Sequence, residues 1–115
     1  MRRAASAILA VVLPAALAAC RPAARATAPV ATDHVLLPRS YLFRPAAIRV
    51  RAGARVWWRN ADVFTHAVRL AGSATPLVMA PGDSVSIVMD SVGLVRYDCP
   101  FHPQMMKGTI EVTPR

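Results

Sequence analysis

Short segments of alternating apolar and polar residues, each followed by a turn signal, constrain the fold more than any other feature of this sequence. In residues 48–51 and 84–89 apolar side chains recur at every second position, as expected for strands with one buried face. Ala52 with Gly53, and Pro81 with Gly82, provide turns between such segments. From residue 34 onward no stretch has a convincing helical period, so the pattern predicts an all-β fold.

The spacing of these segments predicts a β-sandwich, because many short strands separated by turns are typical of two sheets packed face to face. We expect an antiparallel Greek-key sandwich of about seven or eight strands, formed by residues 34–115. Ile110 and Val112 should face the core, and the adjacent Trp57 and Trp58 should face opposite sides of one strand. The strands that the pattern indicates are residues 48–51, 56–59, 67–70, 84–89, 94–99 and 107–112.

The first 19 residues have the layout of an export signal. Met1, Arg2 and Arg3 form a basic start, and residues 4–19 are apolar and rich in alanine. The apolar run is short for a membrane-spanning helix, which needs about 20 residues. We therefore predict a cleaved signal over residues 1–19, with a single membrane anchor as the alternative.

The end of this signal, Leu17-Ala18-Ala19-Cys20, resembles the lipobox of bacterial lipoproteins, in which the cysteine is acylated and becomes the new N-terminus. Residues 20–33, rich in Ala, Pro and Arg, are then expected to form a linker. This arrangement predicts an exported protein on the periplasmic or cell-surface side, tethered to a membrane by lipid on Cys20. Ordinary cleavage near the Ala-Arg-Ala of residues 24–26 is the alternative.

The charge balance of the exported part is basic. Without the two arginines of the signal, twelve Lys and Arg remain against six Asp and Glu. The arginines are dispersed, and an exported protein rarely meets nucleic acid, so we exclude that class of partner. The positive charge is expected to lie on solvated faces and to favour acidic partners or anionic lipids.

Residues 97–108 hold the side chains with the most specific chemistry, and one histidine upstream completes the set. Two imidazoles, a thiolate and a thioether are a donor set that favours copper, whereas zinc gains little from a thioether. With lipid on Cys20, Cys99 would be a lone thiol in an oxidising compartment, where a bound metal protects it. The candidate ligands are His66, Cys99, His102 and either Met105 or Met106.

The order of these residues resembles the cupredoxin (blue-copper) family, and within it the plastocyanin and amicyanin group. The Cys-x-x-His-Pro sequence from Cys99 to Pro103 is similar to the start of the amicyanin ligand loop. The turn from Pro81 to Ser84 also matches, and the resemblance covers about residues 41–113. The matching upstream positions are Phe43, Pro45, Ile48, Val50, Gly53, Val56, Trp58, Asn60, Asp62 and His66.

The resemblance implies a role for each ligand: three equatorial donors and one weak axial methionine. Spacing after the second histidine selects Met105, whereas the Met-x-Gly pattern before the last strand selects Met106, which we prefer because it keeps the strand register. Ala67 stands where the family often has a bracing asparagine, so only its backbone N–H can reach the cysteine sulfur. The equatorial positions are matched by His66, Cys99 and His102.

These features predict one-electron transfer by a single copper ion. We expect no enzyme activity, because the chain has three histidines and no nucleophile or general base is left once the ligands are assigned. The expected partners of this monomer are redox proteins, and its basic charge favours acidic ones. Phe64, Phe101 and Pro103 flank the ligands and form either ordinary packing or an apolar rim for such an encounter. The alternative is a tethered protein that stores or delivers copper, for which Met105 and His34 would be spare donors.

Overall fold

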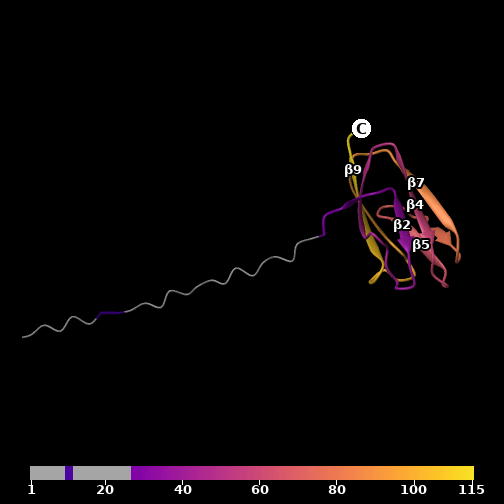
Figure 1. Cartoon of the computed structure of the whole chain (residues 1–115), viewed down its shortest axis with the longest axis horizontal. Helices are drawn as coiled ribbons and strands as arrows, with labels where there is room; N and C mark the ends of the chain where they lie inside the picture. Colours follow the sequence, from indigo (N-terminus) through magenta and orange to yellow (C-terminus); the bar gives the residue numbers. More distant parts are fainter. Residues whose placement is uncertain (1–9, 12–26) are drawn as a thin grey trace, which may run out of the picture.

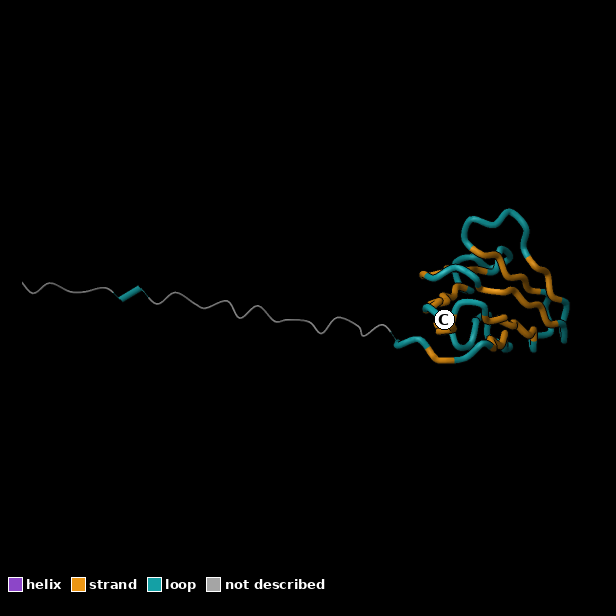
Figure 2. Tube along the Cα trace, turned by 90° about the horizontal axis from the view of Figure 1, so that it is seen from above, coloured by secondary structure: helices purple, strands orange, loops and turns teal. Residues whose placement is uncertain are grey.

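The computed structural model describes residues 10–11 and 27–115, and strands are the regular structure within them (Figure 1). These residues include no helix (Figure 2), so the predicted all-β class is confirmed. Nor does this part of the chain offer a helix long and apolar enough to span a membrane. The nine strands are β1 (Val30–Ala31), β2 (His34–Leu37), β3 (Ala47–Arg51), β4 (Ala54–Asn60), β5 (His66–Leu70), β6 (Leu77–Met79), β7 (Ser84–Met89), β8 (Gly93–Asp98) and β9 (Lys107–Thr113).

The strands form two sheets, so the predicted sandwich is confirmed, with nine strands rather than seven or eight. One sheet has six strands in the order β1-β3-β9-β8-β5-β6. The other has three, in the order β2-β4-β7, and these lie side by side in Figure 1. All six strands indicated by the alternation pattern are present within one or two residues of the expected bounds, whereas β1, β2 and β6 are additional.

The sheets are mixed, which differs from the purely antiparallel sandwich expected from the sequence. Three of the seven strand pairings are parallel, namely β1 with β3, β2 with β4, and β3 with β9. The turn after β3 shows the reason. The Ala52 N–H donates to Thr113 O of β9, while the Gly53 N–H donates to Met89 O of β7 in the other sheet. The chain thus reverses direction twice between β2 and β4, before β3 and after it, and β3 lies in the other sheet, so β2 and β4 run in the same direction.

The core is filled by side chains from both sheets, in the alternating pattern that the sequence predicts. Ile110 and Val112 of β9 are buried as expected. The paired tryptophans separate by face: Trp58 is 0% exposed and Trp57 is 39% exposed. The largest fully buried side chains are Trp58, Phe43, Leu37, Ile48, Met79, Met106 and Ile110.

Strand pairing begins slightly before the domain boundary expected at residue 34. Val30 and Ala31 pair in parallel with Ile48 and Arg49 of β3, although composition predicts a linker over residues 20–33. Two residues are too few for an alternation pattern to reveal a strand. Cys20, and the predicted signal apart from Ala10 and Val11, lie outside the described residues.

Candidate metal centre

The candidate ligands come together because two neighbouring strands of the large sheet are antiparallel. β5 begins at His66, and β8 ends at Asp98, one residue before Cys99. The two strands pair with Arg69 opposite Asp98, so the start of β5 lies beside the end of β8. The Arg69 side chain joins them further by donating to both Asp98 carboxylate oxygens, at 2.9 and 2.8 Å.

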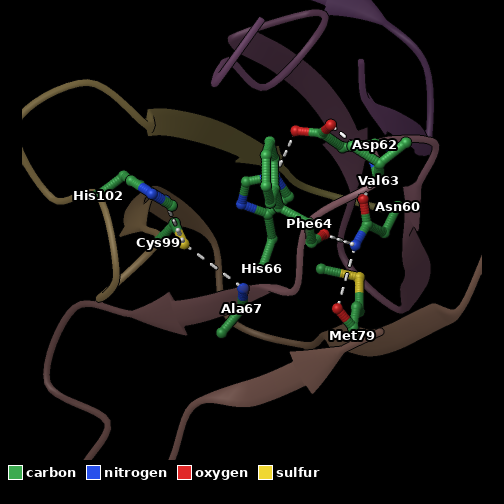
Figure 3. Close-up of polar contacts among 9 residues, drawn as sticks. All are labelled: Asn60, Asp62, Val63, Phe64, His66, Ala67, Met79, Cys99 and His102. Carbon is green, nitrogen blue, oxygen red and sulfur yellow. Dashed lines mark hydrogen bonds and ion pairs between the residues drawn. The ribbon is translucent and has the colours of Figure 1, made fainter. Parts of the chain in front are cut away.

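Three of the predicted ligands form one compact cluster (Figure 3). One donor atom from each of His66, Cys99 and His102 lies within 4.8 Å of the others. The Cys99 Sγ atom is 3.9 Å from His102 Nδ1. The Ala67 N–H also points at this sulfur, at 3.4 Å, which is the backbone contact expected for that position. A donor aimed at the sulfur stabilises the thiolate form that metal binding requires.

His66 presents one ring nitrogen to the cluster and has the other occupied. Its Nε2 atom is 2.8 Å from the Asp62 Oδ2 atom, and both side chains are almost completely buried. Its Nδ1 atom is buried and has no hydrogen-bond partner among the residues that the structure describes. Buried polar atoms are nearly always paired, so an unpaired ring nitrogen facing a thiol and a second imidazole suits a metal ligand.

The donor set of this cluster fits copper. Two imidazole nitrogens and one thiolate are the equatorial set of blue-copper sites, and thiolate is a soft ligand. The orphaned Nδ1 of His66 and the N–H aimed at the Cys99 sulfur are both accounted for by a cation bound among these atoms. The exposed His34 lies outside the cluster and pairs instead with Asp33.

A hydrogen-bonded turn holds Asp62 behind His66. The second Asp62 oxygen accepts the Val63 N–H at 2.6 Å, and the Asp62 N–H donates to the Asn60 side-chain oxygen at 3.0 Å. The Asn60 amide group donates in turn to Phe64 O at 2.8 Å and to Met79 O at 3.1 Å. The hydrogen bond from His66, helped by those from the backbone and opposed by burial, lowers the pKa of the Asp62 carboxyl below its ordinary value.

The ligand loop is closed by its own backbone. The Cys99 N–H donates to Met106 O at 3.0 Å, and the Met106 N–H donates to His102 O at 2.9 Å. Met106 is therefore fixed next to Cys99, and its side chain is 0% exposed. Met105, the other candidate for the axial position, is 59% exposed. The loop thus turns one thioether into the protein and the other into solvent.

An aromatic side chain that the sequence analysis did not single out packs against both histidines. Tyr41 lies edge-on to His102, with ring centroids 4.8 Å apart, and to His66, at 5.9 Å. Its backbone has a φ of 53°, in the left-handed region that residues other than glycine rarely adopt. The sequence pattern likewise assigns no role to Asp62. The spacing of Asp62 and His66, four residues apart, was the available signal.

The surroundings of His102 are apolar and open. Phe64 and Phe101 are each 53% exposed, and Pro103 is also exposed, while His102 itself is half-buried. Tyr41 stacks on Phe64 with ring centroids 5.9 Å apart, which ties this surface to the upstream loop. Exposed apolar side chains therefore lie next to the cluster, as an apolar rim would require.

Comparison with known proteins gives a relative among the plastocyanins. The plastocyanin of Scenedesmus fuscus is 31% identical over 84 residues, a match that covers 62% of this chain and 86% of that protein. The chain belongs to the cupredoxin family. No family model matches the sequence of this cupredoxin.

Solved structures similar to this cupredoxin show the same fold. A purple cupredoxin from Nitrosopumilus maritimus has a TM-score of 0.61 and 24% identity, over 70% of this chain and 98% of that one. An amicyanin mutant in its reduced state has a TM-score of 0.65 and 22% identity, over 77% and 95%. A copper-containing nitrite reductase from Thermus scotoductus has a TM-score of 0.59 and 26% identity, but this chain covers only 22% of it.

Proposed function

We propose that this cupredoxin is a type 1 (blue) copper protein that carries single electrons. The observation that supports this most is the convergence of His66, Cys99 and His102, with a buried and unpaired Nδ1 on His66. Copper bound there would supply a one-electron couple between its two oxidation states. The surrounding residues would keep the donors in place in both states, because two of the three are fully buried.

Met106 is proposed as the axial ligand. The support is its complete burial and the two backbone hydrogen bonds that fix it beside Cys99 and His102. Met105 is not buried and has no backbone hydrogen bond to Cys99, and its side chain faces solvent. A thioether that binds a metal from inside the protein cannot at the same time be mostly solvated, which favours Met106 over Met105.

Electrons would pass through the exposed side of His102. Half-buried His102 is the ligand nearest to solvent, and Phe64 and Phe101 beside it give an apolar surface for a short-lived encounter. The exported part, with twelve Lys and Arg against six Asp and Glu, has a formal net charge of +6, which favours acidic redox proteins as partners. The carrier would be a monomer and not an enzyme, in contrast to the much longer nitrite reductase that shares its fold.

The protein is proposed to act outside the cytoplasm, on the periplasmic or cell-surface side, held to a membrane by lipid on Cys20. The support is the signal-like N-terminus and the lipobox-like sequence that ends at this cysteine. Mass spectrometry of the protein from membranes should find a diacylated N-terminal cysteine. A Cys20→Ala variant should appear in the soluble fraction, and an unmodified N-terminus within residues 24–27 would favour ordinary cleavage instead.

A visible absorption spectrum tests the proposed site. Residues 21–115, which retain all nine strands, should turn blue with copper(II) because a thiolate-to-copper band appears. Cys99→Ser should remove the band and keep the fold, while Ser91→Ala, an exposed control in a distant turn, should keep both. Binding of copper(II) without the band would overturn the blue-copper proposal.

Copper storage or delivery is the second candidate, and the exposure of Met105 favours it. A solvated thioether beside a half-buried ligand offers a soft first contact for copper(I) arriving from or leaving for a partner. The two functions differ in how fast copper is released. A delivery protein should lose copper(I) to a competing chelator within minutes, and Met105→Ala should slow that loss. An electron carrier should retain the metal, with or without Met105.

A further inference from the structure

The buried polar residues of this protein are concentrated behind one histidine. Among the described residues, those that are both polar or charged and buried are Asn60, Asp62 and His66. A buried carboxylate is costly unless its oxygens are hydrogen-bonded and its charge is compensated. Their placement in one chain of contacts, ending at a proposed ligand, therefore calls for an explanation beyond packing (Figure 3).

The Asp62 carboxylate is held so that it can only face the Nε2 atom of His66. One of its oxygens accepts the Val63 N–H at 2.6 Å, which leaves the other to contact His66 at 2.8 Å. Asn60 anchors the turn from the other side through the Asp62 N–H and two backbone carbonyls. Neither side chain of the pair has room to exchange partners with water, since their exposed fractions are 0% and 2%.

We propose that Asp62 is a positioning residue that fixes the tautomer of His66 and places a negative charge behind the copper ligand. Because a carboxylate only accepts, the Nε2 atom must carry the ring proton. The Nδ1 atom then keeps its lone pair, and this is the atom that lies unpaired in the cluster with Cys99 and His102. This inference rests on the proposed copper site.

The charge of Asp62 should also change the balance between the two oxidation states. A carboxylate bonded to a ligand imidazole makes that ligand a stronger donor, and such partners typically change metal affinity by about 10-fold to 100-fold. The more highly charged copper(II) gains more from this than copper(I). An effect of about tenfold on the ratio of the two affinities corresponds to about 59 mV in a one-electron reduction potential.

Two substitutions separate the charge from the hydrogen bond. Asp62→Asn keeps an oxygen that can accept from His66 but removes the charge, whereas Asp62→Ala removes both. Asp90→Asn is the matched control, because Asp90 is exposed and its change alters the net charge equally. Reduction potentials are measured by voltammetry of the copper-loaded proteins. We expect about a tenfold change in the affinity ratio for Asp62→Asn, seen as a rise of about 59 mV. Asp90→Asn should stay at the wild-type potential. Equal potentials in Asp62→Asn and Asp90→Asn would overturn the proposal.

The tautomer is tested without copper. Nitrogen-15 NMR of the metal-free full-length protein should show His66 protonated at Nε2, and Asp62→Ala should yield a mixture of tautomers. A wild-type His66 protonated at Nδ1 would overturn the inference even if no variant folds. If instead the wild-type tautomer is as expected but copper(II) gives no blue band, the proposed function fails while the role of Asp62 in orienting His66 stands.

Discussion

The two histidines of the site occupy opposite surroundings. His66 starts a strand, is 0% exposed, and has its outer nitrogen bonded to a buried carboxylate. His102 lies in a loop, is half-buried, and has Tyr41 and exposed apolar side chains around it. In the proposed function, the buried side fixes the positions of the ligands, and the open side is the surface that would contact redox partners.

The two adjacent methionines differ in the same way, one buried and one exposed, and substitutions there should give the largest difference in stability. Met106→Ala should lower the free energy of unfolding of the metal-free protein by about 2–5 kcal/mol, because a fully buried side chain leaves a cavity. Met105→Ala should change it by no more than about 0.5 kcal/mol, since that side chain is largely solvated. Urea unfolding measures both.

A volume-conserving change separates packing from ligation at the same position. Met106→Leu should cost less than about 1.5 kcal/mol, yet it should shift the absorption spectrum of the copper-loaded protein because the thioether is gone. If Met105→Leu shifts the spectrum and Met106→Leu does not, the proposed assignment of the axial ligand is wrong.

The close contact between Tyr97 of β8 and Gly108 of β9 should tolerate no added volume. A Cβ atom at Gly108 would lie 2.2 Å from the Tyr97 ring, so Gly108→Ala should destabilise the protein by about 1–3 kcal/mol. In a Tyr97→Ala background the same change should cost clearly less, because the ring is absent. Thermal unfolding of the four proteins measures the coupling, and simple additivity would argue against this contact.

Tyr97 should also make the stability of the protein fall at alkaline pH. Its hydroxyl is buried without a hydrogen-bond partner in the described part of the chain, and burial raises the pKa of Tyr97 to about 12 from 10.0. The neutral form is thus favoured in the folded protein, and its contribution to stability is complete below pH 10. Between about pH 10 and 12 this group should reduce the free energy of unfolding by about 1.4 kcal/mol per pH unit.

Tyr97→Phe removes the titrating group and keeps the ring. Stability of this variant, measured by urea unfolding across the same pH range, should lack that part of the decline and should match or exceed the wild type at pH 7, because a buried unpaired hydroxyl is lost. Tyr41→Phe serves as the control and should retain the decline. An unchanged pH profile in Tyr97→Phe would show that other groups cause it.

The smallest effect is expected at the exposed link between β5 and β8. Arg69 and Asp98 form a two-point ion pair, but their side chains are 39% and 26% exposed, so water and salt weaken it. Arg69→Met should cost about 0.2–1 kcal/mol and less in high salt. The more exposed pair of Arg49 and Glu111 offers a control in Arg49→Met, which should cost no more. A larger loss at Arg69, with a changed copper spectrum, would mean that this pair holds Cys99 in place.

Sequence could predict the cluster of one cysteine and two histidines because these residue types are rare in the chain and their order is specific. His66 begins β5 and Cys99 directly follows β8, two strands that the alternation pattern locates. His102 lies in the loop that follows Cys99, so the convergence of the three side chains follows from the sandwich. Asp62 and Tyr41 were not predicted, because their roles depend on a turn geometry and on a loop packed from elsewhere in the chain. The parallel pairings were missed for a similar reason: alternation reveals which face of a strand is buried, but not which strand lies beside it.

A redox titration of the copper-loaded protein, followed by metal analysis, tests the central claim most directly. The account predicts that one electron per chain bleaches the blue band, that reoxidation restores it, and that one copper ion per chain remains after repeated cycles. Loss of copper on reduction would contradict electron transfer and identify the protein as a copper carrier. Retention of copper without any reversible change in the band would contradict the blue-copper site itself.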